Sequence, residues 1–270
     1  MKIAWFCIPA HGHTNPTLGL VKELTDAGHE VFYFSFEQFR AKIESAGAHF
    51  ISCDGYDFEM EDKENADRVG KDKAFASELL VSSTLALDDM TTEKITEIKP
   101  DIVVSDSVAF WGKLVAMKHG LPYVSSTTTF AFNRYSAQYM KHGVWETVKM
   151  LFTMPRINKQ IARLREKGYP VKGFLEIVQN DNETNTIVYT SKYFQPCSET
   201  FRTVTTSSAR RSAPSRSLSQ KPRKRPSTFP WERSIRTGSF TGIAFMPWDR
   251  QGGRSSSPWE QIRIILRICR

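Results

Sequence analysis

The sequence predicts an α/β fold in which residues 1–201 form a doubly wound parallel sheet. Short apolar runs alternate with helical segments from the N-terminus onward, a pattern typical of strands covered by helices on both faces. Glycines follow several of the helical segments, where a left-handed residue commonly ends a helix. Apolar residues make up 40% of the 270 residues, which is enough for one large hydrophobic core.

Six segments have the character of strands. The first is the continuous apolar run KIAWFCI at residues 2–8, and a strand without a polar face suits a sheet that is buried on both sides. The other predicted strands are residues 29–36, 48–53, 101–105, 121–126 and 186–190.

The helical segments separate these strands. We predict the first helix over residues 16–27, because Asn15 is a good N-cap, Pro16 fits the first helical position and Gly28 suits the stop. A polar loop is expected over residues 54–73. The other predicted helices are residues 37–46, 75–98, 108–119 and 145–167.

Charge divides the chain near residue 201. Residues 1–201 carry 22 Lys/Arg and 26 Asp/Glu, whereas residues 202–270 carry 15 Lys/Arg and 3 Asp/Glu. The second segment is rich in Ser, Arg and Pro and has weak periodicity, which favours disorder. We therefore predict a folded domain at 1–201 and a basic, disordered tail at 202–270.

Cysteine usage and hydropathy indicate the compartment. The four cysteines are scattered without a paired spacing, which is typical of a reduced, cytoplasmic chain. No apolar window reaches the length of a membrane span. The apolar start is interrupted by Pro9 and has no small-residue cleavage site, so we do not expect a signal peptide.

Two polar residues stand where strands of such a sheet end, which is where ligands bind in open α/β sheets. His13 lies in the segment PAHGHTNP after the first strand, and Asp106 follows DIVVS. If the first and fourth strands are neighbours, these side chains meet. A carboxylate bound to one ring nitrogen sets the tautomer, and the other nitrogen can then take a proton from a hydroxyl. Taken alone, His13 is more typical of an ordinary polar histidine in a loop, and Asp106 is more typical of a cap or turn former at the end of a strand.

Two other chemistries are not favoured. His11 and His13 have no clear third partner, so we expect no metal site. The glycine pattern GxGxxG of dinucleotide-binding loops is absent, which weakens a dehydrogenase interpretation.

Three stretches together resemble the macrolide-type UDP-glycosyltransferase family: IPAHGHTNPTLGLVKELTDAGHEVFY, PDIVVSDSVAFWGKLVAMKHGLPYV and FQPCSETF. The resemblance covers roughly residues 1–201. It implies the Rossmann-like, acceptor-binding N-terminal domain of a GT-B glycosyltransferase. Such an enzyme transfers a hexose, here expected to be glucose, from a UDP-sugar to a hydroxyl of a small hydrophobic acceptor such as a macrolide or flavonoid, with inversion.

The resemblance also assigns roles to residues. Carried over, His13 is the general base that deprotonates the acceptor, and Asp106 orients it and balances the imidazolium. The UDP-sugar is a donor substrate, and no cofactor or metal is implied. Acceptor pockets in the family are lined by apolar and aromatic side chains, for which the candidates here are Phe130, Phe132, Tyr135 and Tyr139. Packing in the core is an equally good explanation for any one of these aromatics.

The tail departs from the family, because the glycine-rich segment and the His-Gly-Gly stretch of its donor-binding domain are absent. A shifted reading frame explains this. Reading the last base of one codon with the first two of the next turns every Trp-Glu or Trp-Asp pair into glycine, and with permitted codons residues 205–210 read as HFVGP and 227–236 as YISMGTVN. Those strings resemble the family's linker and first donor-domain strand. We therefore expect a one-base loss near codon 201 and little activity in this chain.

Two other functions remain open. The segment KPRKRP at 221–226 would bind nucleic-acid phosphates without sequence preference and with strong salt dependence, although the body of the chain has no recognisable nucleic-acid module. Alternatively, the chain is a non-catalytic acceptor-binding fragment.

Overall fold

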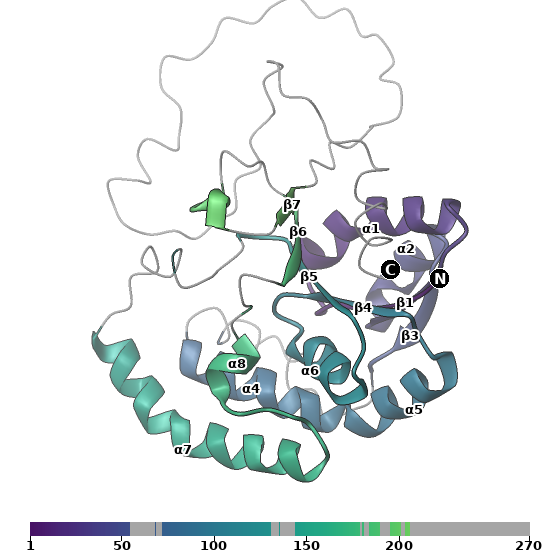
Figure 1. Ribbon diagram of the computed structural model, residues 1–270. Coiled ribbons are helices and arrows are strands. Elements are labelled where there is room, and N and C mark those ends of the chain that lie inside the picture. Colours follow the sequence, from purple (N-terminus) through teal and green to yellow (C-terminus); the bar gives the residue numbers. More distant parts are fainter. Residues whose placement is uncertain are drawn as a thin grey trace, which may run out of the picture. The chain divides into compact units, whose positions relative to one another are not determined.

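The structure is a computed structural model, and it describes residues 1–54, 68, 72–130, 135, 144–178, 180, 184–189, 195–200 and 203–205 (Figure 1). All of these residues belong to one compact unit of the chain. Within them, no helix is long and apolar enough to cross a membrane. The predicted loop at 54–73 and the predicted tail at 202–270 lie largely outside the described residues.

Seven parallel strands form one sheet in the order β3-β2-β1-β4-β5-β6-β7. The chain therefore winds outward from β1 in one direction and then returns to add β4 on the other side of β1. This doubly wound arrangement confirms the predicted fold class. The strands are β1 Lys2–Phe6, β2 Glu30–Ser35, β3 His49–Ser52, β4 Ile102–Asp106, β5 Tyr123–Thr127, β6 Asn185–Val188 and β7 Thr203–Thr205.

The strand β7 extends the sheet beyond residue 201. It pairs with β6 through the register Thr186 with Thr203, so three residues of the predicted tail belong to the sheet. Its Thr-Val-Thr sequence is β-branched throughout, which suits a strand. The predicted boundary followed the change in charge at Arg202 and passed over this short signal.

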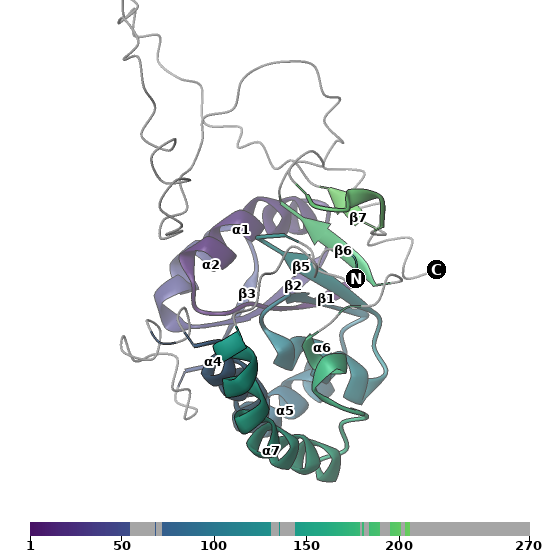
Figure 2. The same ribbon diagram turned by 90° about the vertical axis from the view of Figure 1, so that its left-hand side faces the viewer.

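The helices lie on both faces of the sheet (Figure 2). On one face are α1 and α2, and on the other are α4, α5, α6 and α7. The helices and short 3-10 turns are α1 His11–Asp26, η1 Glu37–Phe39, α2 Arg40–Ser45, α4 Lys73–Ala86, α5 Asp88–Ile98, α6 Phe110–His119, α7 Val144–Glu166, α8 Phe174–Val178 and η4 Ser198–Thr200.

Two of the predicted helices differ in their bounds. The helix α1 begins at His11 with Ala10 as its N-cap, so Pro16 lies inside the helix and not at its start. Proline lacks an N–H, so in a regular helix it removes the hydrogen bond to the carbonyl four residues earlier. That carbonyl belongs to Gly12, an exposed residue open to water. The predicted helix at 75–98 is two helices that meet at Leu87.

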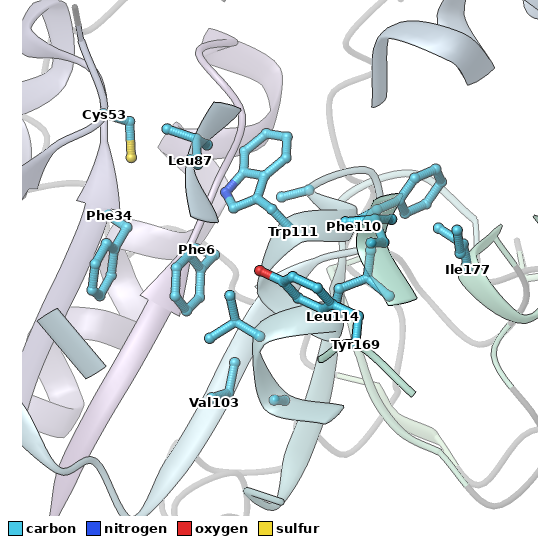
Figure 3. Packing of buried hydrophobic residues seen from close by; sticks show 14 of the residues in the cluster. Phe6, Phe34, Cys53, Leu87, Val103, Phe110, Trp111, Leu114, Tyr169 and Ile177 are labelled. Atoms are coloured by element: carbon cyan, nitrogen blue, oxygen red, sulfur yellow. The ribbon is translucent and has the colours of Figure 1, made fainter. Parts of the chain in front are cut away.

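Alternate residues of the central strands fill two separate cores. Trp5 packs with Leu20 and Leu24 of α1 on one face of the sheet. On the other face, Phe6 stacks on Phe34 with ring centroids 4.3 Å apart. Figure 3 shows this second core, in which Trp111 and Leu114 of α6 and Tyr169 gather over β1, β2 and β4. A strand buried on both faces is what the unbroken apolar run of β1 predicts.

Close packing of α6 on the sheet fixes the end of β4. Gly112 lies against Ser105 and Phe6, and a methyl group at this glycine would overlap with Ser105 Oγ. The hydroxyl of Ser105 donates a 2.8 Å hydrogen bond to the carbonyl of Ala109, just before α6. The turn that joins β4 to α6 is therefore fixed by the packing of Gly112 on β4 and by the hydrogen bond between Ser105 and Ala109.

Candidate active site

His13 and Asp106 meet at the point where the strand order reverses. β1 and β4 are neighbours, paired from Ile3 with Ile102 to Phe6 with Ser105. His13 follows β1 in the first turn of α1, and Asp106 is the last residue of β4. Side chains at the carboxyl ends of adjacent parallel strands converge at one edge of the sheet, and the reversal leaves a crevice there for ligands.

The backbone around His13 is held by the helix start. The N–H groups of His13 and Thr14 both donate to the carbonyl of Ala10, at 3.0 and 2.9 Å. His13 is therefore a helical residue, whereas the sequence predicted it in a loop. The side chain of Asn15, predicted as the cap, instead accepts a hydrogen bond from Lys42 at 3.3 Å.

The two side chains form a tight pair. Asp106 Oδ2 lies 2.7 Å from His13 Nδ1, with the Asp106 side chain fully buried and the His13 side chain 18% exposed. The other carboxylate oxygen, Oδ1, accepts a 2.8 Å hydrogen bond from the N–H of Val108. Among the described residues, His13 Nε2 has no hydrogen-bond partner. The pair therefore offers one ring nitrogen to a carboxylate and leaves the other for a substrate.

Cys7, one residue past β1, is fully buried near this pair. Burial raises the pKa of its thiol far above the ordinary value, and the nearby negative charge of Asp106 raises it further. Cys7 thus stays protonated at neutral pH and is no nucleophile, since the thiolate is the reactive form.

The structure describes two of the four predicted acceptor-binding aromatics. Phe130 and Tyr135 follow β5 and are exposed by 41% and 40%. That exposure excludes the core as the place of these two side chains. Phe132 and Tyr139 lie outside the described residues.

A groove between α4 and α7 was not predicted from the sequence. It encloses about 680 Å³, and its walls include Phe75, Trp145 and Phe152. Ion pairs span it, Lys149 with Asp72 at 3.7 Å and Arg156 with Glu78 at 3.6 Å. Neither His13 nor Asp106 is among its lining residues.

The signal for this groove was present in α7. Its first half carries a second apolar stripe at helical spacing on the side away from the core. Among the residues of this stripe, Trp145 and Phe152 are 70% and 79% exposed. The remaining members are Val144, Val148 and Leu151.

No group of three or more His, Cys, Asp or Glu side chains in the described part of the chain is arranged to hold a metal ion.

The parallel doubly wound sheet has the fold of a domain of the GT-B glycosyltransferases. The match to solved structures agrees: the calicheamicin glycosyltransferase CalG4 superposes with a TM-score of 0.55 at 26% identity, over 74% of this chain and 49% of that one.

Curated relatives are more specific. The chain is 30% identical over 209 residues to the demethyllactenocin mycarosyltransferase of Streptomyces fradiae, covering 74% of this chain and 44% of the relative. It is 29% identical over 199 residues to the NDP-glycosyltransferase YjiC of Bacillus subtilis, covering 74% of this chain and 48% of the relative. No protein-family model matches. Over about three quarters of its length, the chain is similar to macrolide-type NDP-sugar glycosyltransferases.

The chain spans about half the length of the curated relatives that it matches.

Proposed function

We propose that this chain is the acceptor-side half of an inverting UDP-glycosyltransferase, with His13 as its general base. The observation that carries the proposal is the 2.7 Å contact between Asp106 Oδ2 and His13 Nδ1 at the switch point of the sheet. The family of the relatives supports the reaction class. We further propose that the transferred sugar is glucose and that the acceptor is a macrolide or a flavonoid.

The geometry suits proton removal from an alcohol. Because the Asp106 carboxylate can only accept, the short contact requires the proton on His13 Nδ1, which leaves the lone pair on Nε2. As Nε2 takes the hydroxyl proton, the acceptor oxygen attacks the anomeric carbon and the bond to UDP breaks. Attack from the face opposite UDP inverts that carbon. Asp106 then stabilises the imidazolium without taking the proton itself.

The UDP-sugar must be bound by a second wall of the active site, meaning a protein surface that faces the edge of the sheet where His13 lies. Transfer requires the base and the anomeric carbon to be fixed in attack geometry. We propose that the coding sequence for this wall continues in another frame after codon 201, as the forced glycines of residues 202–270 suggest. The chain as it stands then has a base and no fixed donor. We also propose a cytoplasmic location, which the unpaired cysteines of the described residues, Cys7, Cys53 and Cys197, support.

The hydrophobic acceptor has two candidate surfaces. Phe130 and Tyr135 are exposed just after β5, and the groove between α4 and α7 presents Phe75, Trp145 and Phe152. Rigid aromatic side chains gain affinity for apolar ligands at low entropic cost. Truncating Phe152 to Ala should weaken binding of a flavonoid or macrolide by roughly fivefold or more. Leu175→Ala, which removes a similarly exposed side chain outside the groove, is the control.

A nucleotide test and an activity test examine the proposal. Adding one base near codon 201 should open a long frame that encodes a His-Gly-Gly motif, and an early stop codon would refute the frame shift. The present chain should give little turnover with UDP-glucose and a flavonoid or macrolide acceptor. The chain translated from the corrected reading frame, called the restored enzyme below, should catalyse the transfer. Acceptor binding that is unaffected by His13→Ala, with no turnover in the restored enzyme, would favour a non-catalytic acceptor-binding protein.

A further inference from the structure

A second side chain contacts the same ring nitrogen of His13. Thr128 directly follows β5, and its Oγ1 lies 3.1 Å from His13 Nδ1. β4 and β5 are neighbours in parallel register, with Asp106 opposite Ser126. Side chains at the carboxyl ends of two adjacent strands, Asp106 and Thr128, therefore contact the same atom, His13 Nδ1.

The direction of these hydrogen bonds follows from the acceptors. An ionised carboxylate has no proton to give, so at 2.7 Å His13 Nδ1 donates to Asp106 Oδ2. Nδ1 carries a single proton, and its lone pair belongs to the aromatic ring when that proton is present. Thr128 Oγ1 can then only accept, and it shares the same N–H with the carboxylate in a three-centre bond.

We propose that Thr128 is a positioning residue for His13, holding the imidazole as the Nδ1–H tautomer in one orientation. This role rests on the proposed function, in which Nε2 must keep its lone pair toward the acceptor. A single acceptor allows the ring to pivot about its bond to Cβ, whereas two acceptors from different strands restrict that rotation. When Nε2 gains a proton, Nδ1–H keeps both partners, so the arrangement serves both protonation states.

The tautomer can be read directly, without any turnover. We would label the 270-residue chain with ¹⁵N and record long-range correlations of the imidazole nitrogens. His13→Gln assigns the His13 signals among the six histidines. In the unsubstituted chain, His13 should show a protonated Nδ1 and an unprotonated Nε2.

Thr128→Val keeps the shape of the side chain and removes the hydroxyl. It should lower the ratio of Nδ1–H to Nε2–H tautomer by about two- to tenfold, the range expected for one lost hydrogen bond. Thr128→Ser, which keeps the hydroxyl, should restore the ratio. Thr129→Val is the matched control, since Thr129 is the next residue and is exposed, and it should leave the ratio unchanged.

An unchanged tautomer ratio in Thr128→Val would overturn the proposal, as would an equal change in the Thr129→Val control. Failure of Thr128→Ser to restore the ratio would also count against it, because the hydroxyl would then not be the cause. These outcomes are separate from the proposed reaction. The same spectra can support the positioning role even if His13 proves not to be the base.

Discussion

At the scale of single residues, the site is set by where one proton lies. The carboxylate of Asp106 is fully buried, receives the Val108 N–H on one oxygen and faces His13 Nδ1 with the other. Each carboxylate oxygen of Asp106 therefore has a hydrogen-bond partner, Val108 N–H for Oδ1 and His13 Nδ1 for Oδ2. The side chain of His13 is partly exposed, which leaves room for an alcohol to approach.

Asp106→Asn tests this arrangement with little change in shape. The Asn carbonyl can still accept from Val108, which turns its amide NH2 toward His13 Nδ1 and favours the wrong tautomer. In the restored enzyme, kcat should fall by about 10²–10⁴-fold, as expected when a base loses its orienting carboxylate. Acceptor affinity and thermal unfolding, measured on the same preparation, should change little. A variant with kcat within threefold of the parent would contradict the role of Asp106.

Part of this site could be predicted from the sequence. The placement of His13 and Asp106 at the ends of two apolar runs, together with the crossover rule for parallel sheets, was enough to expect their contact. The contribution of Thr128 was not predictable, because Thr127, Thr128 and Thr129 are identical in type. Only the register of β5 beside β4 decides which of the three reaches the imidazole.

At the scale of elements, α6 ties the end of β4 to the core through a close contact. Gly112 packs so tightly that a methyl group would stand 2.7 Å from Ser105 Cβ and 2.8 Å from Phe6 Cβ. Ser105 precedes Asp106, so displacement of α6 reaches the site through the strand end.

Gly112→Ala should therefore destabilise the chain by about 1–3 kcal/mol, the usual cost of an overpacked core position. The matched control is Gly19→Ala in α1, where a methyl group meets nothing within 4 Å. Because alanine favours helix over glycine, that variant should gain about 0.5–1 kcal/mol. Urea unfolding of both variants checks the pair, and a neutral Gly112→Ala would show that α6 relaxes freely.

A buried charge cluster joins α5 and α6 to the chain that follows α7. Asp88, 4% exposed, accepts hydrogen bonds from Lys118 at 2.6 Å, Tyr169 at 2.6 Å and Lys167 at 2.9 Å. Burial acts to raise the pKa of Asp88, but the hydrogen bonds outweigh it and hold the pKa at about 2, below its ordinary value of 3.8. The ionised carboxylate is thus favoured by the folded state.

A depressed pKa in the folded state stabilises the protein above the pKa of the unfolded state. The contribution of Asp88 should be complete above about pH 4 and be lost as the pH falls towards 2. Asp88→Asn should cost about 2 kcal/mol at neutral pH and flatten the acid side of the stability profile. Asp89→Asn is the control, since Asp89 is 91% exposed and shares Lys167. Equal acid profiles for Asp88→Asn and the parent chain would contradict this account.

The elements themselves were largely predictable, and their ends were not. Apolar runs located β1 to β6, of which all but β3 are mostly buried, and Gly28 followed α1 with a φ of +84° as expected. The start of α1 was misplaced because capping preferences favoured Asn15, whereas contacts of His13 with β4 support an earlier turn. The break at Leu87 was missed although a local signal was present, since Asp88 and Asp89 place two acidic residues in the first turn of α5.

At the scale of the whole molecule, the described fold supplies the acceptor side of the proposed reaction. The doubly wound sheet places His13, the proposed base, at its switch point, and apolar side chains remain exposed at Trp145 and Phe152. Large exposed apolar side chains mark surfaces that bind ligands or other protein surfaces. The sequence could predict this half from its alternating pattern, while the charge and composition of residues 202–270 predict only that the pattern stops.

The central claim is that His13 removes the acceptor proton, and His13→Gln tests it most directly. The measurement is kcat for glucosyl transfer from UDP-glucose in the restored enzyme, with acceptor Kd determined in parallel. We predict a fall in kcat of about 10²–10⁴-fold, because general-base catalysis is lost, with acceptor Kd unchanged within a factor of about two. Turnover by His13→Gln at a rate close to that of the parent enzyme would contradict the account.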